Sequence, residues 1–286
     1  MIIDGHAHAC GPFLEAGGVV ELLDRNGVDK VVLVPGIPGG TKTYSLPPLA
    51  KWFPNRDVVF WTNLLTKGLI FLAGAARYIA EGNRYVHSLV TVCPARILQF
   101  YWVQLSRPDA LDDLERDYPI FRFQGVKLHQ CWESFRVDSD RFHCLAEWAE
   151  SRGLPIFVHL FSTGQASRLA HYIQQHPRTR FIVAHLFGLK RYIESGLSSK
   201  NVLFETSAPA VISVARIMKA VAHFGADRVV LGSDTPFGRD NQAVNVRRVR
   251  NLDISDEAKG MILGDNIRQW LNLSDSPQIG PRWQTE

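Results

Sequence analysis

Short apolar runs recur along the chain, and polar or amphipathic stretches separate them. The runs predicted as strands cover residues 1–6, 30–35, 86–93, 125–129, 155–159, 180–185, 201–206 and 228–233. Segments with helical spacing lie at 18–26, 109–117, 138–152, 164–176 and 213–224. Apolar runs without polar alternation are typical of parallel strands that helices cover on both faces. Strands and helices in this alternation predict a parallel sheet with helical crossovers.

Eight such strands predict a single-domain α/β fold, the (β/α)8 or TIM barrel, because eight parallel strands close a barrel of this kind. An open doubly wound sheet is the alternative, but it favours a glycine-rich phosphate loop after the first strand. Here the first strand leads into Asp4-Gly-His6-Ala-His8 instead. We expect the barrel over residues 1–273 and a mostly polar, loosely held C-terminal tail over residues 274–286.

The connection between the second and third predicted strands departs from this compact pattern. Residues 41–55 indicate a loop excursion on the face where loops follow the carboxyl ends of the strands. Residues 58–76 are mostly apolar, but they contain Asn63 and Lys67 and precede several charged residues. A membrane span needs about 20 apolar residues with few charges. We therefore interpret this stretch as a buried barrel helix, with a lid or a subunit contact as alternatives for part of it.

The overall composition narrows the class of protein. Hydrophobic residues make up 46% of the 286 residues and charged residues 21%, which is ordinary for a soluble globular enzyme. The net charge is +4 and no basic run exceeds Arg247-Arg248, so we expect no nucleic-acid partner. The four cysteines show no CxxC spacing and no signal peptide precedes them, which favours a cytoplasmic protein with reduced thiols. We expect a small-molecule substrate and no membrane partner; a homo-oligomer stays open.

Polar residues end five of the predicted strands: His6 and His8, Lys127 and His129, His159, His185, and Asp234. Residues two apart on a strand share a face, so the first two histidines can hold one metal ion. In a barrel, all these strand ends face one pit. Zinc prefers imidazole nitrogen and carboxylate oxygen, and it lowers the pKa of a bound water from 15.7 toward about 7. Three histidines and an aspartate therefore predict a metal-activated water.

The ordered set of motifs resembles the amidohydrolase superfamily, in its amidohydrolase-related branch of metal-dependent hydrolases and decarboxylases. The motifs are Asp4-Gly-His6-Ala-His8, Gly125-Val-Lys127-Leu-His129, Phe157-Val-His159, Val183-Ala-His185 and Gly232-Ser-Asp234-Thr-Pro236-Phe. Residues 262–271 also resemble the closing helix of that branch. The likeness covers nearly the whole chain.

The resemblance implies a role for each of these residues. His6, His8, His159 and Asp234 would be the ligands of one ion, most simply zinc. Asp234 would also be the general base, and His185 an electrostatic or acid–base group beside the ion. Lys127 has two readings. In binuclear members a lysine at this strand is carboxylated and bridges two ions, with the histidine of the sixth strand as a ligand. We favour one ion and an unmodified lysine.

Other polar and aromatic residues could bind a substrate. Lys127 and His129 share a face and can reach the pit. Arg239 follows the last strand, where it could bind a carboxylate bidentately or remain solvated. Phe161, Phe187 and Trp132 could wall an apolar pocket or pack in the core. For Glu205 we expect a buried salt bridge rather than acid catalysis, and for Cys10 and Cys131 simple burial.

These features predict a metal-dependent hydrolase in which activated water attacks an ester, lactone or amide-like carbon of a small molecule. The alternative is a lyase that uses the same site for non-oxidative decarboxylation of an aromatic or unsaturated carboxylic acid. A metal-binding scaffold without activity is disfavoured because no expected ligand is missing.

Overall fold

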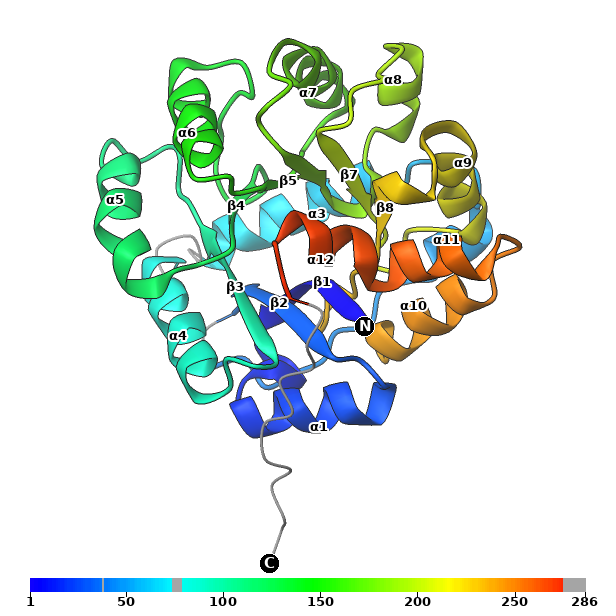
Figure 1. The fold of residues 1–286 in the computed structure, drawn as a ribbon, viewed down its shortest axis with the longest axis horizontal. Coiled ribbons are helices and arrows are strands. Elements are labelled where there is room, and N and C mark those ends of the chain that lie inside the picture. Colours follow the sequence, from blue (N-terminus) through cyan, green and yellow to red (C-terminus); the bar gives the residue numbers. More distant parts are fainter. Residues whose placement is uncertain (38, 74–78, 275–286) are drawn as a thin grey trace, which may run out of the picture.

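The computed structural model describes residues 1–37, 39–73 and 79–274, and its strands form a TIM barrel, as predicted (Figure 1). The strands pair in parallel and in sequence order: β1 (Ile3–Ala9), β2 (Lys30–Pro35), β3 (Ile97–Trp102), β4 (Gly125–His129), β5 (Ile156–His159), β6 (Phe181–Val183), β7 (Val202–Glu205) and β8 (Val229–Val230). The chain just after β8 then bonds to β1: the Gly5 amide donates to Leu231 O at 2.9 Å and the Ser233 amide to His6 O at 3.1 Å. These bonds bring the last strand back against the first.

Helices surround the strands in Figure 1, and most of them bury apolar side chains against the barrel. They are α1 (Ala16–Asn26), α4 (Ile79–Val92), α5 (Ala110–Phe121), α6 (Asp140–Ser151), α7 (Thr163–Gln175), α8 (Leu189–Glu194), α9 (Val214–Phe224), α10 (Asn241–Arg250), α11 (Asp256–Gly260) and α12 (Asn266–Trp270). Short turns of other helix types are η1 (Gly11–Phe13), η3 (Ala184–Leu186), η4 (Ala226–Arg228) and η5 (Met261–Asp265). Local sequence sets several of these boundaries. Gly27 ends α1 in the left-handed region at φ 63°, and the Ser213 side chain caps α9.

Most predicted elements appear with small shifts in their ends. The bounds of β2 and β4 agree with the prediction to the residue. Strand β1 runs on to Ala9, so His6 and His8 lie within the strand rather than after it.

The third predicted strand was wrong. Residues 86–92 belong to helix α4, and the strand is Ile97–Trp102. The β-branched residues of 86–93 favoured a strand, but the buried positions Ile79, Asn83, Val86 and Leu89 recur every three or four residues, as on one face of a helix. All six residues of β3 are buried, so this strand shows no alternation that would mark it in the sequence.

The excursion, defined here as residues 36–73, contains α2 (Leu49–Trp52) and α3 (Val59–Ala73). We predicted a buried barrel helix here, and that prediction was wrong for most of α3. Its side chains Trp61, Phe71 and Leu72 are 68%, 84% and 82% exposed. In Figure 1, α3 lies behind β4 and β5. Just before α3, Asp57 forms a salt bridge with Arg216 of α9 at 2.9 Å, which ties this segment to the barrel. The lid and the subunit contact stay open.

Two other expectations concern membrane spans and the C-terminal tail. Among the described residues, no helix is both long enough and apolar enough to cross a membrane. Residues 275–286 of the expected tail lie outside the described residues, so the loosely held tail stays a prediction.

Candidate metal centre

His6 and His8 point from the same face of β1 into the barrel end, as their spacing predicts. The His6 ring rests on Phe157 of β5, with 4.4 Å between ring centroids. The Nδ1 of His8 donates to the carbonyl of Pro35 at 2.8 Å, because a carbonyl can only accept. Its Nε2 is therefore the atom with a free lone pair, and it lies 3.3 Å from Asp234 Oδ1.

Asp234 stands on the loop after β8, where the backbone turns sharply. Its φ is 58°, in the left-handed region that side chains rarely adopt. Asp4 holds this loop by accepting from the Ser233 amide at 2.8 Å and from Gln242 at 2.9 Å. Burial raises the pKa of Asp234, but its close contact with His8 and the positive charge that His185, His8 and Lys127 carry when protonated lower it below its ordinary value. Asp234 is therefore ionised at neutral pH.

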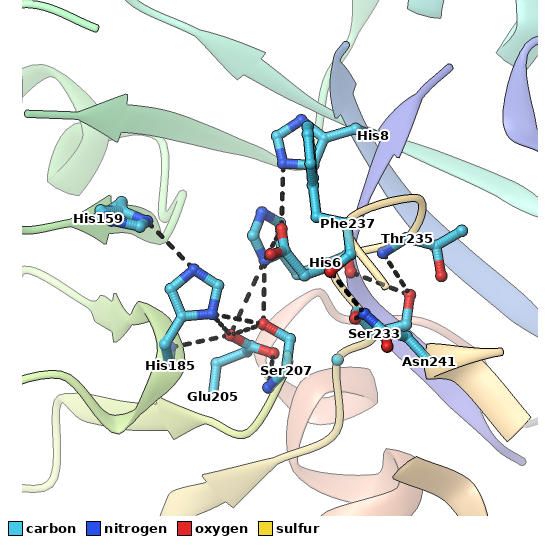
Figure 2. Close-up of polar contacts among 12 residues, drawn as sticks. His6, His8, His159, His185, Glu205, Ser207, Ser233, Thr235, Phe237 and Asn241 are labelled. Atoms are coloured by element: carbon cyan, nitrogen blue, oxygen red, sulfur yellow. Dashed lines mark hydrogen bonds and ion pairs between the residues drawn. The ribbon is translucent and has the colours of Figure 1, made fainter. Parts of the chain in front are cut away.

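His159 and His185 form a second pair beside the first. The Nε2 of His185 lies 3.1 Å from the Nδ1 of His159 (Figure 2). The other nitrogen of His159, Nε2, lies 2.7 Å from Asn63 Oδ1. In the sequence, Asn63 stands out only as a polar residue within an apolar stretch. Its spacing from His159 matches no known motif.

Glu205 and Ser207 lie behind His185. The Ser207 hydroxyl is 2.8 Å from His185 Nδ1, 2.7 Å from Glu205 Oε2 and 3.4 Å from His6 Nδ1 (Figure 2). Burial raises the pKa of Glu205 to about 8, so it carries a proton at neutral pH. Burial also lowers the pKa of His185 to about 4, so these contacts are hydrogen bonds between neutral groups rather than the expected salt bridge. Ser207 was not predicted, although its i, i+2 spacing from Glu205 repeats the signal of the His pair.

Lys127 is fully buried and faces the same pit. Its Nζ lies 3.1 Å from His6 Nε2 and 4.0 Å above the Phe157 ring. Burial lowers the pKa of Lys127 to about 7, so much of the population is uncharged at neutral pH. A neutral amine can accept the hydrogen of His6, which leaves His6 Nδ1 facing Asp234 Oδ1 at 3.8 Å.

The remaining predicted site residues divide into buried and exposed ones. His129 is stacked between Trp102 and His159, with 3.8 Å between the two imidazole centroids. Arg239 is exposed. Phe187 is buried, whereas Phe161 and Trp132 are partly buried. Cys10 and Cys131 are buried as expected, and burial raises the pKa of their thiols to about 11 and about 12.

Within the described part of the chain, three groups of side chains place their donor atoms within 4.8 Å of one another: His6 with His8 and Asp234, His6 with His185 and Glu205, and His129 with Cys131 and His159. The first group holds three of the four predicted ligands, and His159 stands outside it. Burial lowers the pKa of His6 and His159 well below the ordinary range, so both rings are neutral and offer a lone pair. Neutral imidazoles beside an ionised carboxylate fit a divalent ion such as zinc.

Comparisons with known proteins agree with the fold. A family model described as amidohydrolase matches residues 73–273, whereas no curated protein sequence matches the chain. The crystal structure of 2,6-dihydroxybenzoate decarboxylase from Rhizobium has 15% sequence identity and a TM-score of 0.67, over 95% of this chain and 98% of that one. Dihydroxybenzoic acid decarboxylase from Polaromonas sp. JS666, with bound manganese, has 16% identity and a TM-score of 0.67, over 95% and 97% of the two chains.

A different activity occurs among the similar structures. The 4-oxalomesaconate hydratase from Rhodopseudomonas palustris has 14% identity and a TM-score of 0.63, over 95% of this chain and 96% of that one. At such identities the likeness shows the barrel fold alone, because one fold carries many activities.

Proposed function

Because the chain belongs to the amidohydrolase family, we propose that it is a metal-dependent enzyme that removes carbon dioxide from an aromatic or unsaturated carboxylic acid. The proposed ligands of one divalent ion are His6, His8, His159 and Asp234. His159 would join the first three by turning its Nδ1 from His185 toward them. The ion would supply a Lewis acid that holds and polarises a substrate oxygen.

The burial of the site is the observation that favours decarboxylation. His6, His8 and His159 are buried, and the apolar ring of Phe157 lies directly against His6. A substrate carboxylate loses its hydration in such surroundings, and leaving as neutral carbon dioxide removes that charge. Several structures of similar fold also come from decarboxylases.

Decarboxylation also needs a proton donor, because the electron pair of the broken bond stays on the substrate carbon. His185 is suited to this role. Its Nε2 faces the pit beside His159, and its Nδ1 contacts the Ser207 hydroxyl that joins it to Glu205. A proton held on Glu205 can reach His185 through Ser207 as His185 gives up its own.

Hydrolysis of an ester, lactone or amide-like carbon, the reaction that the sequence favoured, is the second candidate. The ionised Asp234 supports it, because a carboxylate at this position can accept the proton of a water nucleophile. Hydrolysis requires water at the buried histidines, whereas decarboxylation does not.

Metal content and products together test the proposal. Metal-depleted protein is reloaded with zinc or with manganese, and each form is assayed with hydroxybenzoates and with lactones and esters. We expect about one ion per chain, release of carbon dioxide from a hydroxybenzoate and, in D2O, one deuteron at the carbon that loses the carboxyl group. Hydrolysis without carbon dioxide would establish the second candidate. A full ion content with no turnover of either class would contradict both.

A further inference from the structure

Asn63 is a buried amide on a helix that turns several large apolar side chains to solvent. It is 2% exposed, whereas Trp61, Leu65 and Leu69 on the same helix are 68%, 63% and 59% exposed. Its Nδ2 donates to the carbonyls of Leu160 at 2.9 Å and Phe161 at 3.2 Å. Its Oδ1 lies 2.7 Å from His159 Nε2. Asn63 therefore connects α3 both to the end of β5 and to a proposed metal ligand.

The two carbonyl partners determine which way the amide faces. If the amide were turned over, its oxygen would lie against two carbonyl oxygens, and no hydrogen would stand between them. The oxygen therefore faces His159 and can only accept. It follows that Nε2 of His159 carries the hydrogen. In the neutral ring, Nδ1 then carries the lone pair, and Nδ1 is the nitrogen that faces His185 at 3.1 Å.

We propose that Asn63 is a positioning residue: it holds His159 as the Nε2–H tautomer, so that the metal is bound through Nδ1, and it thereby couples the docking of α3 to metal affinity. The proposal rests on the ligand role of His159 in the proposed function. His8 shows the same arrangement with the nitrogens exchanged, since its Nδ1 donates to Pro35 O at 2.8 Å and Nε2 stays free. Partners of this kind typically change metal affinity by about 10- to 100-fold.

Coupling of two binding events is reciprocal. If a docked α3 strengthens metal binding through Asn63, a bound metal must strengthen the docking of α3 by the same factor. Amide hydrogens of α3 should therefore exchange more slowly in the zinc-loaded protein than in the metal-free protein. This slowing should disappear when Asn63 is replaced by leucine.

The test compares four variants of the full chain. Asn63→Leu removes the acceptor, and Asn63→Asp keeps an acceptor for His159 but cannot donate to the two carbonyls. Asn83→Leu is the matched control, because Asn83 is also a buried helix asparagine, 1% exposed, and its side chain bonds to the backbone N–H and carbonyl of Trp102 rather than to a proposed ligand. His159→Ala is the reference for loss of the ligand. Zinc affinity is measured by competition with a chelating dye.

We expect Asn63→Leu to weaken zinc binding by about 10- to 100-fold, while Asn63→Asp and Asn83→Leu stay within a few-fold of the wild type. Nitrogen NMR of the metal-free wild type should show the hydrogen of His159 on Nε2. A hydrogen on Nδ1 would overturn the proposal, and so would wild-type affinity in Asn63→Leu when His159→Ala binds weakly. Wild-type affinity in His159→Ala would instead refute the ligand role itself. If Asn63→Leu does not fold, the tautomer of His159 in the wild type and the zinc affinity of Asn63→Asp test the proposal.

Discussion

The site is built from two regions that differ in how they are held. The rim, which we define as residues 4–8, 127–129, 159, 185, 205–207 and 232–235, stands at the strand ends, and hydrogen bonds from several directions hold its side chains. The excursion lies over β5. Its contacts with the barrel include polar ones from Asp57 and Asn63 and the buried side chains of Val58 and Val59. The rim thus stands on the strands of the barrel, whereas the excursion is a long connection, and we expect this connection to open more readily than the strands.

The burial of the histidines links the rim to the excursion. His6, His8 and His159 are nearly inaccessible to solvent, and Asn63 of the excursion contacts one of them directly. If the excursion acts as a lid, we expect a substrate to reach the rim when part of this covering moves. The exposed apolar face of α3 is the outer surface of this covering.

The largest expected effect concerns the rim. If the reaction is hydrolysis, Asp234→Asn should lower the turnover of the metal-loaded protein by about 10²- to 10⁴-fold, because an amide cannot accept the proton of the water nucleophile at neutral pH. Decarboxylation needs Asp234 only as a ligand of the ion. The barrel should keep its melting temperature within a few degrees. Turnover is measured after loading with metal, and ion content is determined on the same sample. A metal-loaded variant with near wild-type turnover would remove Asp234 from the proton-transfer step.

His185→Ala tests whether that residue is a catalytic group or an essential ligand. We expect about one ion per chain to remain while turnover falls by about 10²- to 10³-fold, the range for loss of one donor to developing charge. The binuclear alternative has different consequences: two ions in the wild type, a carboxylated Lys127, and loss of one ion in the variant. Metal counting together with intact mass of both proteins separates the two readings.

The rim was largely predictable from the sequence, and the excursion was not. Strands β2 and β4 are marked by local apolar runs, and β4 also carries the polar residues Lys127 and His129, so these strand bounds follow from nearby residues. Residues 86–93 were misread because β-branched residues favour strands, whereas the packing of α4 against β2 and β3 depends on which positions become buried.

Contacts between distant segments explain what the sequence could not show. The bond between Asn63 and His159 spans 96 positions along the chain, and no periodicity in either segment marks it. The exposure of the apolar face of α3 also depends on how distant segments pack. A mostly apolar stretch predicts burial when nothing else is known, but only the tertiary structure shows that this helix lies outside the closed barrel.

Two glycine substitutions measure the difference in packing between the regions, and Gly232→Ala has the larger effect. A Cβ at Gly232 would lie 1.9 Å from Glu205 Oε1, inside the rim. The carboxylate would have to leave its bond with the Ser207 amide. We expect the free energy of unfolding to fall by about 1–3 kcal/mol, as in other overpacked sites. Urea unfolding of the metal-free variant measures this, and an unchanged midpoint would mean that the rim is loosely packed.

Gly68→Ala is the counterpart on α3 and has the smallest expected effect. A Cβ there meets no atom within 4 Å, so alanine adds no clash, and it stabilises a helix interior by about 0.5–1 kcal/mol relative to glycine. If the excursion opens separately from the barrel, slower amide exchange in α3 will show this gain, while the urea midpoint of the barrel stays unchanged. A rise of the urea midpoint that corresponds to the whole gain of about 0.5–1 kcal/mol would show that α3 and the barrel unfold as one unit. The division between a rigid rim and a weakly held cover would then be wrong, and substrate entry would need another route.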